Sequence, residues 1–297
     1  MVLPRERLLI TGASGMLGYA LCLQAEQAYD VYGTCFNNEV MAPGVKPVKI
    51  DLADGEQIAR CFQEINPQAV IHTAALSRPN DCEQQQERSR LINLQATIDI
   101  ARFCAASKIP LVFTSSDLVF NGQDAPYNED DPVSPICVYG KHKVAAEKAL
   151  WEIYPKAAIS RMPLMLGGAP GANSGFLAHM VRTLRNKEQL LLFTDEFRTA
   201  VDTDSAATGL LIALKHPGAI LHLGGRRRLS RFTMGCLVAD VLKTDHALLK
   251  PMLAKDLPMP APRSPDVSLS SERAYALGYA PEDLAGYLER TVLRIVL

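Results

Sequence analysis

The chain has 297 residues, 48% of them hydrophobic, and 31 Lys and Arg residues against 32 Asp and Glu residues give a net charge of -1. A chain of this length can bury one large α/β core or two fused lobes. The charge balance gives no electrostatic reason to expect a nucleic acid or a membrane surface as a partner. The densest basic run, Arg226-Arg227-Arg228 with Arg231 nearby, is best interpreted as a solvated loop, with phosphate binding as the alternative.

The seven cysteines are scattered and form no CxxC pair. An odd, scattered set fits a reducing compartment better than a disulfide framework. Cysteines, histidines and carboxylates show no metal-ligand spacing, so we expect no metal. No apolar run approaches the roughly 20 residues that span a bilayer, and an expected strand close to Met1 leaves no room for a signal peptide. We therefore expect a soluble, cytoplasmic protein.

Short apolar runs alternate with helical patterns through the first half of the sequence. The expected strands are residues 7–10, 31–35, 48–50, 69–72, 110–115 and 158–161. The expected helices are residues 16–28, 54–65, 84–107 and 139–154. Continuous apolar strands interleaved with helices are typical of a parallel sheet covered on both faces. The pattern predicts an α/β, Rossmann-type doubly wound sheet, which binds ligands at the carboxyl ends of its strands.

A glycine-spaced turn joins the first expected strand to the first helix. Gly12 permits a tight turn, Gly15 lets the backbone approach a pyrophosphate, and Gly18 allows the helix to pack closely on the strand. The N–H groups at the start of that helix then favour an anion. The residues of this turn that we expect to bind a dinucleotide are Gly12, Ser14, Gly15, Met16, Leu17 and Gly18.

The end of the second strand, where a dinucleotide fold holds the adenosine ribose, is neutral in this chain. It reads Cys35-Phe36-Asn37-Asn38, and the absence of a carboxylate permits NADP, while the absence of an arginine leaves the preference weak. We expect NADP, with NAD as the alternative, and place Asn37 near the adenosine. Asp51, followed by Leu52 after the third strand, either accepts a hydrogen bond from the adenine or caps the next helix.

A phenol and an ammonium group stand four positions apart at the start of a later expected helix. Tyr139 and Lys143 therefore project from one face of that helix. A nearby cation favours the phenolate, so Lys143 is expected to lower the pKa of Tyr139 toward the working range. The fifth strand ends in Thr114-Ser115-Ser116-Asp117, whose hydroxyls can orient a carbonyl while Tyr139 delivers its proton.

Beyond Pro163 the alternation becomes irregular. The elements expected there are helices at 176–186, 205–214 and 232–241, a short strand at 220–223, a final helix, and connections at 167–171 and 251–265. We predict an NAD(P)-binding domain over residues 1–162 and a smaller substrate-binding lobe over residues 163–297, some segments of which can return to the first domain.

Together these residues resemble the extended short-chain dehydrogenase/reductases. The segment SSDLVFNG at residues 115–122 is similar to the S-T-D-Y-V-F-x-G segment of the dTDP-4-dehydrorhamnose reductase branch. RSPDVSL at residues 263–269 resembles the late Arg-Pro segment of that branch, with the proline displaced by one. The resemblance covers the whole chain, strongly to about residue 162 and loosely after it.

The resemblance implies that Ser116, Tyr139 and Lys143 are the catalytic three, with Lys143 also holding the nicotinamide ribose. It implies that Ala74 and Ala75, after the fourth strand, line the cofactor. Ser116 replaces the usual threonine of this branch, and either residue supplies a hydroxyl.

Several other polar residues have two readings. Asn93 falls where the family often has an asparagine that supports the lysine, and a polar residue on a long helix is the alternative. His72 is better interpreted as packed than as a ligand, and His142 is given no role. The residues with a candidate role in binding a substrate diphosphate, each with a structural ion pair as its alternative, are Arg161, Arg198 and Arg263.

The expected activity is reduction of a nucleotide-linked 4-keto-6-deoxy sugar, such as dTDP-4-dehydrorhamnose, by NAD(P)H. The related 4,6-dehydratases carry an acidic pair after the hydroxyl residue, but Leu118 follows Asp117 here, which disfavours dehydration. One alternative is a non-catalytic nucleotide-binding subunit like the regulatory β subunit of methionine adenosyltransferase. Another is an epimerase that keeps bound NAD. A homodimer is the expected assembly if the chain is not a monomer.

Overall fold

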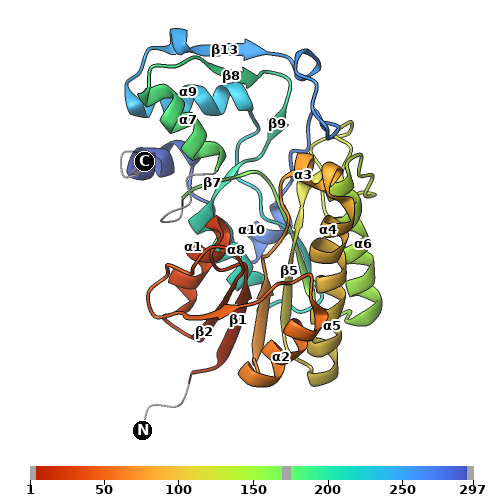
Figure 1. The fold of residues 1–297 in the computed structure, drawn as a ribbon. Coiled ribbons are helices and arrows are strands. Elements are labelled where there is room, and N and C mark those ends of the chain that lie inside the picture. The colour runs from red at the N-terminus through yellow and green to blue at the C-terminus, as the bar shows by residue number, and fades with distance from the viewer. Residues whose placement is uncertain (1–4, 169–174, 293–297) are drawn as a thin grey trace.

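The computed structural model describes residues 5–168 and 175–292, and its largest element is a sheet of seven strands (Figure 1). The order across the sheet is β11-β6-β5-β4-β1-β2-β3, and every pairing in it is parallel. The strands are β1 (Arg7–Thr11), β2 (Asp30–Cys35), β3 (Lys46–Lys49), β4 (Ala69–His72), β5 (Leu111–Ser116), β6 (Ala158–Met162) and β11 (Ile220–His222). The predicted Rossmann-type α/β fold is confirmed.

Helices cover both faces of the sheet because adjacent residues of a strand point to opposite faces. In β1, Leu8 and Ile10 pack into a core with the first helix, whereas Leu9 packs into the core on the other face. The helices of the first face are α1 (Met16–Ala25) and α8 (Thr203–Ala213). Those of the second face are α2 (Gly55–Ile65), α5 (Ala96–Ser107) and α6 (Val138–Ile153).

The region predicted as one helix over residues 84–107 is divided in the structure. It contains α4 (Gln86–Arg90), a π-helical turn (Leu91–Gln95) and α5, and it is preceded by α3 (Pro79–Gln84). The buried side chain of Asn93 lies in the π-helical turn and exchanges two 3.0 Å hydrogen bonds with the backbone of Leu76. The π-helical turn therefore holds Leu76 in the segment that follows β4. Single π-helical turns occur often near functional sites.

The later part of the chain forms a second, smaller packing unit above the sheet (Figure 1). Three two-stranded sheets pair β8 (Leu190–Phe193) with β13 (Leu249–Met252), β9 (Phe197–Arg198) with β12 (Leu229–Ser230), and β7 (Met165–Leu166) with β10 (Val201–Asp202). The helices of this unit are α7 (Phe176–Arg185), α9 (Arg231–Leu242) and α11 (Leu284–Thr291), whereas α10 (Glu272–Ala276) packs against β11 of the large sheet. Single turns of 3-10 helix are Asp117–Val119, His246–Leu248 and Ala254–Asp256.

The predicted helices of this part are present, but its short strands were not predicted. The connection expected at 167–171 falls partly on residues 169–171, which lie outside the described residues. The proline-rich stretch expected as a loop from residue 251 begins inside β13. The division of the chain at residue 163 stays a prediction, and β11, which lies beyond it, pairs with β6. Within the described ranges no helix is long and apolar enough to cross a bilayer, and all seven cysteines are free thiols.

Two glycines make the turn after β1 possible. Gly12 has φ +72°, and a Cβ on it would stand 2.8 Å from the Cα of Ala74. A Cβ on Gly18 would stand 2.1 Å from the carbonyl oxygen of Gly12. Only glycine fits either position, because the obstacle in each case is backbone that cannot rotate aside.

We predict that Gly18→Ala lowers the free energy of unfolding by roughly 1–3 kcal/mol, because the added methyl group forces α1 away from the strand. Chemical denaturation measures this change. Gly286→Ala is the matched control, since Gly286 is inside α11 and a Cβ there meets only the flexible end of Glu282 at 3.3 Å. The control should be neutral or stabilising. Equal effects of the two changes would contradict the steric account.

Candidate active site

A cleft of about 830 Å³ lies at the carboxyl ends of the central strands. This volume is within the range of about 300–1,000 Å³ for small-molecule and cofactor sites. The residues expected at the cofactor all line it: Gly12, Ser14, Gly15, Met16, Leu17, Gly18, Asn37, Asp51, Leu52, Ala74, Ala75, Tyr139 and Lys143. Ser116, Arg198 and Arg263 line the same cleft. Residues from both halves of the sequence are thus brought together at the carboxyl ends of the strands.

One section of the cleft is made by the start of α1. Gly15 is the N-cap residue of this helix, and its side chain makes no capping hydrogen bond. The first turn of the helix contains no acidic residue. The backbone N–H groups there are the donors that a helix leaves for an external acceptor, so this section suits a phosphate or pyrophosphate.

Ser116 and Tyr139 are brought together by the close packing of α6 on the turn that follows β5. Cys137 caps α6 by accepting a hydrogen bond from the Gly140 N–H at 3.4 Å. A Cβ on Gly140 would stand 2.1 Å from the carbonyl oxygen of Leu118. The absence of a side chain at residue 140 therefore allows Tyr139 to reach the end of β5, where its phenol interacts with the Ser116 hydroxyl.

Lys143 occupies the next turn of α6 and is buried, with only 1% of its surface exposed. Its Nζ donates to the backbone carbonyl of Thr114 at 2.8 Å. The same atom lies 5.7 Å from the centre of the Tyr139 ring. The predicted grouping of Ser116, Tyr139 and Lys143 on one wall of the cleft thus has a definite geometry.

Burial is the largest influence on the pKa values of Tyr139 and Lys143. It raises the pKa of Tyr139 above its ordinary value, Asp117 raises it further, and the hydrogen bond with Ser116 opposes both. Burial also lowers the pKa of Lys143 to about 7, against the attraction of Glu147. The expected lowering of the Tyr139 pKa by Lys143 is therefore not found, because withdrawal from water disfavours both charged forms. Tyr139 is a neutral phenol that can give a proton.

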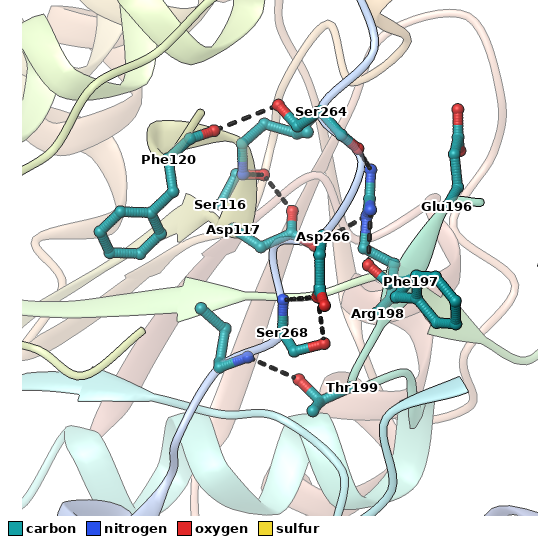
Figure 2. Close-up of polar contacts among 12 residues, drawn as sticks. Ser116, Asp117, Phe120, Glu196, Phe197, Arg198, Thr199, Ser264, Asp266 and Ser268 are labelled. Carbon is teal, nitrogen blue, oxygen red and sulfur yellow. Dashed lines mark hydrogen bonds and ion pairs between the residues drawn. The ribbon is translucent and has the colours of Figure 1, made fainter. Parts of the chain in front are cut away.

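Asp117 stands beside Ser116 and is almost fully buried. Its Oδ1 accepts a 3.0 Å hydrogen bond from the Ser116 hydroxyl (Figure 2), and its Oδ2 has no hydrogen-bond partner within the described part of the chain. Burial raises the pKa of Asp117, while Arg198, whose Nε is 3.5 Å from Oδ2, pulls it down. The Asp117 carboxyl group therefore links the Ser116 hydroxyl, which it holds in place, to Arg198 of the second packing unit.

Three guanidinium groups from the second packing unit stand together in the lining of the cleft. Arg198, Arg231 and Arg263 all line it. The fully buried Glu196 accepts two hydrogen bonds from Arg263, at 2.5 and 2.6 Å, and lies 3.5 Å from the Nε of Arg231. Burial pushes the pKa of Glu196 up, but the hydrogen bonds and charge of Arg263 leave it below its ordinary value.

With Glu196 and Asp117 as the two neighbouring carboxylates, the three guanidinium groups leave an excess of positive charge in this part of the cleft. Arg198 is held in place by donating to the backbone carbonyls of Phe197 and Ser264, and Ser264 in turn donates to the carbonyl of Phe120 (Figure 2). This part of the cleft is preorganised for an anionic group such as a phosphate.

Arg161 requires a correction, because the structure places it away from the cleft. It forms a buried ion pair with Glu147 at 2.9 Å and donates to the backbone carbonyl of Glu129 at 3.3 Å. It is not among the residues that line the cleft. The structural ion pair, the alternative that the sequence left open, is the role this arginine has, and we withdraw it as a substrate-binding candidate.

The remaining sequence candidates have clear positions. Asp54 and not Asp51 caps α2, and Asp51 accepts from the Ala53 N–H at 2.9 Å within the cleft lining. His72 is buried between the hydroxyls of Thr11 and Thr97, and burial lowers its pKa to about 3. This packed environment matches its expected structural role.

Sequence reasoning missed two arginines of the cleft, Arg78 and Arg88, and it named Arg231 only beside the basic run, with phosphate binding as the alternative. The signal for Arg231 was its closeness to the basic run, but Arg227 and Arg228 of that run are half-exposed and pair with Asp283 and Asp266. Arg88 had no signal, since Phe36 and Asp51, the residues it approaches, are far from it in the sequence. In the described parts of the chain, no three His, Cys, Asp or Glu side chains gather as a metal site.

We predict that Lys143→Met abolishes most activity yet raises the free energy of unfolding at pH 6–7 by roughly 1–4 kcal/mol, because it removes a buried charge. Between about pH 7, the folded pKa, and 10.5, the ordinary value, the unfolded chain binds more protons than the folded one. Wild-type stability therefore gains from Lys143 as pH rises, and the advantage of the variant shrinks.

Denaturation curves at pH 6, 7.5 and 9 measure this advantage. Lys141→Met, on an exposed position of the same helix, is the control and should show no such pH trend. A variant that is less stable than wild type at pH 6, or an advantage that grows with pH, would contradict the account.

Comparison with known proteins gives a family and several relatives. The model of the family described as RmlD substrate binding domain matches residues 6–292. The methionine adenosyltransferase 2 subunit beta of Rattus norvegicus is 29% identical over 259 residues, covering 84% of this chain and 76% of that protein. The probable low-salt glycan biosynthesis reductase Agl14 of Haloferax volcanii is 28% identical, covering 86% of each.

Solved structures have the same fold. A dTDP-4-dehydrorhamnose reductase from Bacillus anthracis, in complex with NADP, has a TM-score of 0.84 at 22% identity, covering 98% of this chain and 99% of that one. A hypothetical dTDP-4-dehydrorhamnose reductase from Sulfolobus tokodaii has a TM-score of 0.82 at 26% identity, covering 94% of this chain and 98% of that one. The resemblance stated from the sequence is confirmed.

Proposed function

Because this chain belongs to the RmlD substrate binding domain family and aligns a hydroxyl, a phenol and an amine on one wall of its cleft, we propose that it is an NAD(P)H-dependent reductase. The substrate class is a nucleotide-linked 4-keto-6-deoxy sugar such as dTDP-4-dehydrorhamnose. The observation that supports this most is the position of Tyr139 beside Ser116, at the carboxyl end of β5 and in the lining of the cleft.

The cleft suits the cofactor in shape and in charge. Gly12 and Gly18 keep the turn after β1 compact, and Gly15 presents the start of α1 without a side chain. Residues from Gly12 to Gly18 would hold the pyrophosphate, while Tyr139 and Lys143 mark the nicotinamide end. The bound nicotinamide would supply a hydride to the ketone carbon.

Side chains of the protein would supply the proton that the carbonyl oxygen of the substrate takes up. The Ser116 hydroxyl, fixed by Asp117, would orient the carbonyl oxygen, and the neutral phenol of Tyr139 would give that oxygen its proton as the alcohol forms. Lys143, protonated below about pH 7, would stabilise the phenolate that remains until a proton returns from solvent. Leu118 lines the cleft where related dehydratases need an acid, so elimination has no proton-transfer group there.

The arginines of the second packing unit would bind the substrate's diphosphate. Arg198 and Arg263 are retained from the sequence, and Arg231 joins them on the evidence of its position. Two guanidinium groups tied to the same buried carboxylate, Glu196, form a fixed pair of donors with little entropy left to lose on binding.

We predict that Tyr139→Phe retains NADPH binding within about threefold and loses at least about 100-fold in turnover, because only the transferable proton is removed. NADPH oxidation with a panel of nucleotide-linked keto-sugars measures turnover, and fluorescence titration measures binding. Val138→Ala, the preceding residue of α6, is a control for disturbance of the helix start. Unchanged turnover in Tyr139→Phe would remove the phenol from the mechanism.

We predict that Arg231→Gln raises the KM for the nucleotide-sugar at least about tenfold while the Kd for NADPH stays unchanged, because a charge-assisted contact with phosphate is lost. Arg227→Gln is the matched control, since that arginine is half-exposed and pairs with Asp283. Parallel effects of the two changes on KM would show that Arg231 is not a specific phosphate ligand.

A second candidate, a nucleotide-binding regulatory subunit, is favoured by the similarity to methionine adenosyltransferase 2 subunit beta. Capture of a stoichiometric partner enzyme, together with absence of NADPH oxidation on every keto-sugar, would support it. An epimerase would instead retain its cofactor through dialysis and interconvert sugars without net oxidation. A homodimer and a cytoplasmic location complete the proposal.

A further inference from the structure

An arginine from α4 occupies the end of the cleft away from the catalytic group. Arg88 lines the cleft together with Phe36 and Asp51. Its guanidinium carbon lies 5.5 Å from the centre of the Phe36 ring, and its Nη2 lies 3.8 Å from the Oδ2 of Asp51. The three side chains come from α4, the end of β2 and the end of β3, so this cluster depends on the tertiary fold.

This end of the cleft is where the proposed function places the adenosine. Tyr139 and Lys143 mark the nicotinamide end, and the turn from Gly12 to Gly18 marks the pyrophosphate. The ribose of the adenosine then lies at the end of the second strand, as in dinucleotide-binding sheets generally. The residues of β2 and its following turn that line the cleft are Thr34, Cys35, Phe36, Asn37 and Asn38, and none is acidic.

The contacts of Arg88 leave its donors available to a ligand. The guanidinium donates no hydrogen bond to any residue within 5–168 or 175–292, and its approach to Asp51 is an ion pair without a hydrogen bond. The side chain is 42% exposed, and so is Phe36. An arginine resting on an aromatic face keeps the edge of its planar fork free to bind a phosphate through two parallel hydrogen bonds.

The negative charge of Asp51 opposes the binding of an anion beside Arg88, but its contact with the guanidinium is loose enough for an anion to replace it. Its Oδ1 is engaged with the Ala53 N–H at 2.9 Å, and its Oδ2 faces Arg88. A phosphate that displaces this loose pairing exchanges a long contact for short, charge-assisted ones. The pairing also holds the guanidinium against Phe36 beforehand, which limits the entropy lost on binding.

We propose that Arg88 binds the 2′-phosphate of NADP, so that the cofactor preference of this chain is set from α4 and not from the turn after β2. This inference rests on the proposed function, because it takes the cleft to be a dinucleotide site. The neutral residues Phe36-Asn37-Asn38 predict only a weak preference for NADP over NAD, whereas a phosphate contact with Arg88 makes that preference strong.

Calorimetric titration of 2′,5′-ADP and 5′-ADP tests the proposal without requiring turnover. The wild type should bind 2′,5′-ADP about 10- to 100-fold more tightly than 5′-ADP, the gain typical of a bidentate arginine–phosphate contact. Arg88→Ala should remove most of this ratio, and Arg88→Lys, which keeps the charge but not the fork, should retain part of it. Asp51→Asn should increase the ratio, since it removes the competing carboxylate.

Arg90→Ala is the matched control. Arg90 is on the same short helix, pairs with Glu87 at 2.8 Å and does not line the cleft, so the ratio should not change. A wild type that binds both nucleotides equally, or a ratio that survives Arg88→Ala, would overturn the inference and leave the proposed function intact. Failure of the wild type to bind either nucleotide would overturn both. The two failures are therefore distinguishable.

Discussion

The close approach of α6 to the turn after β5 is the constraint on which the catalytic arrangement depends. Gly140 has no room for a Cβ against the Leu118 carbonyl, and this contact sets both the height and the rotation of the helix start. Tyr139 is then directed to the end of the strand, and Lys143 reaches back to the Thr114 carbonyl. The packing of α6 against the sheet thus holds Tyr139 and Lys143 in buried positions, although burial disfavours the charged forms of both side chains.

Charge is distributed unevenly along the cleft. Around Tyr139 the charged forms of the phenol and the amine are both disfavoured by burial. In the part of the lining that comes from the second packing unit, Glu196 keeps Arg231 and Arg263 in place. A neutral proton donor in a cleft with positively charged groups suits a substrate and a cofactor that both carry phosphates and meet at an uncharged carbonyl.

The sequence predicted those features that depend on neighbours along the chain. The apolar strands, the turn from Gly12 to Gly18 and the spacing of Tyr139 and Lys143 are local patterns, and each was found where expected. The end of β5 could be recognised in the same way, because hydroxyl residues interrupt an apolar run. The grouping of these residues on one wall then followed from the parallel topology.

What the sequence could not predict depends on contacts between distant elements. Arg161 and Arg198 look alike as isolated arginines, yet the first pairs with Glu147 away from the cleft and the second pairs with Asp117 in the lining of the cleft. Arg88 is on α4, and its contact with Phe36 beyond the end of β2 joins two distant parts of the sequence. The raised pKa of Tyr139 likewise follows from burial, which residue spacing does not reveal.

The central claim is that this cleft joins a hydride donor to a sugar ketone beside Tyr139. Reduction of dTDP-4-dehydrorhamnose with NADPH deuterated at C4 of the nicotinamide, followed by mass and NMR analysis of the sugar, tests it most directly. The account predicts one deuterium at C4 of the product sugar, transferred from one face of the nicotinamide only. A product without deuterium at that carbon, or no reduction of any nucleotide-linked keto-sugar, would contradict it.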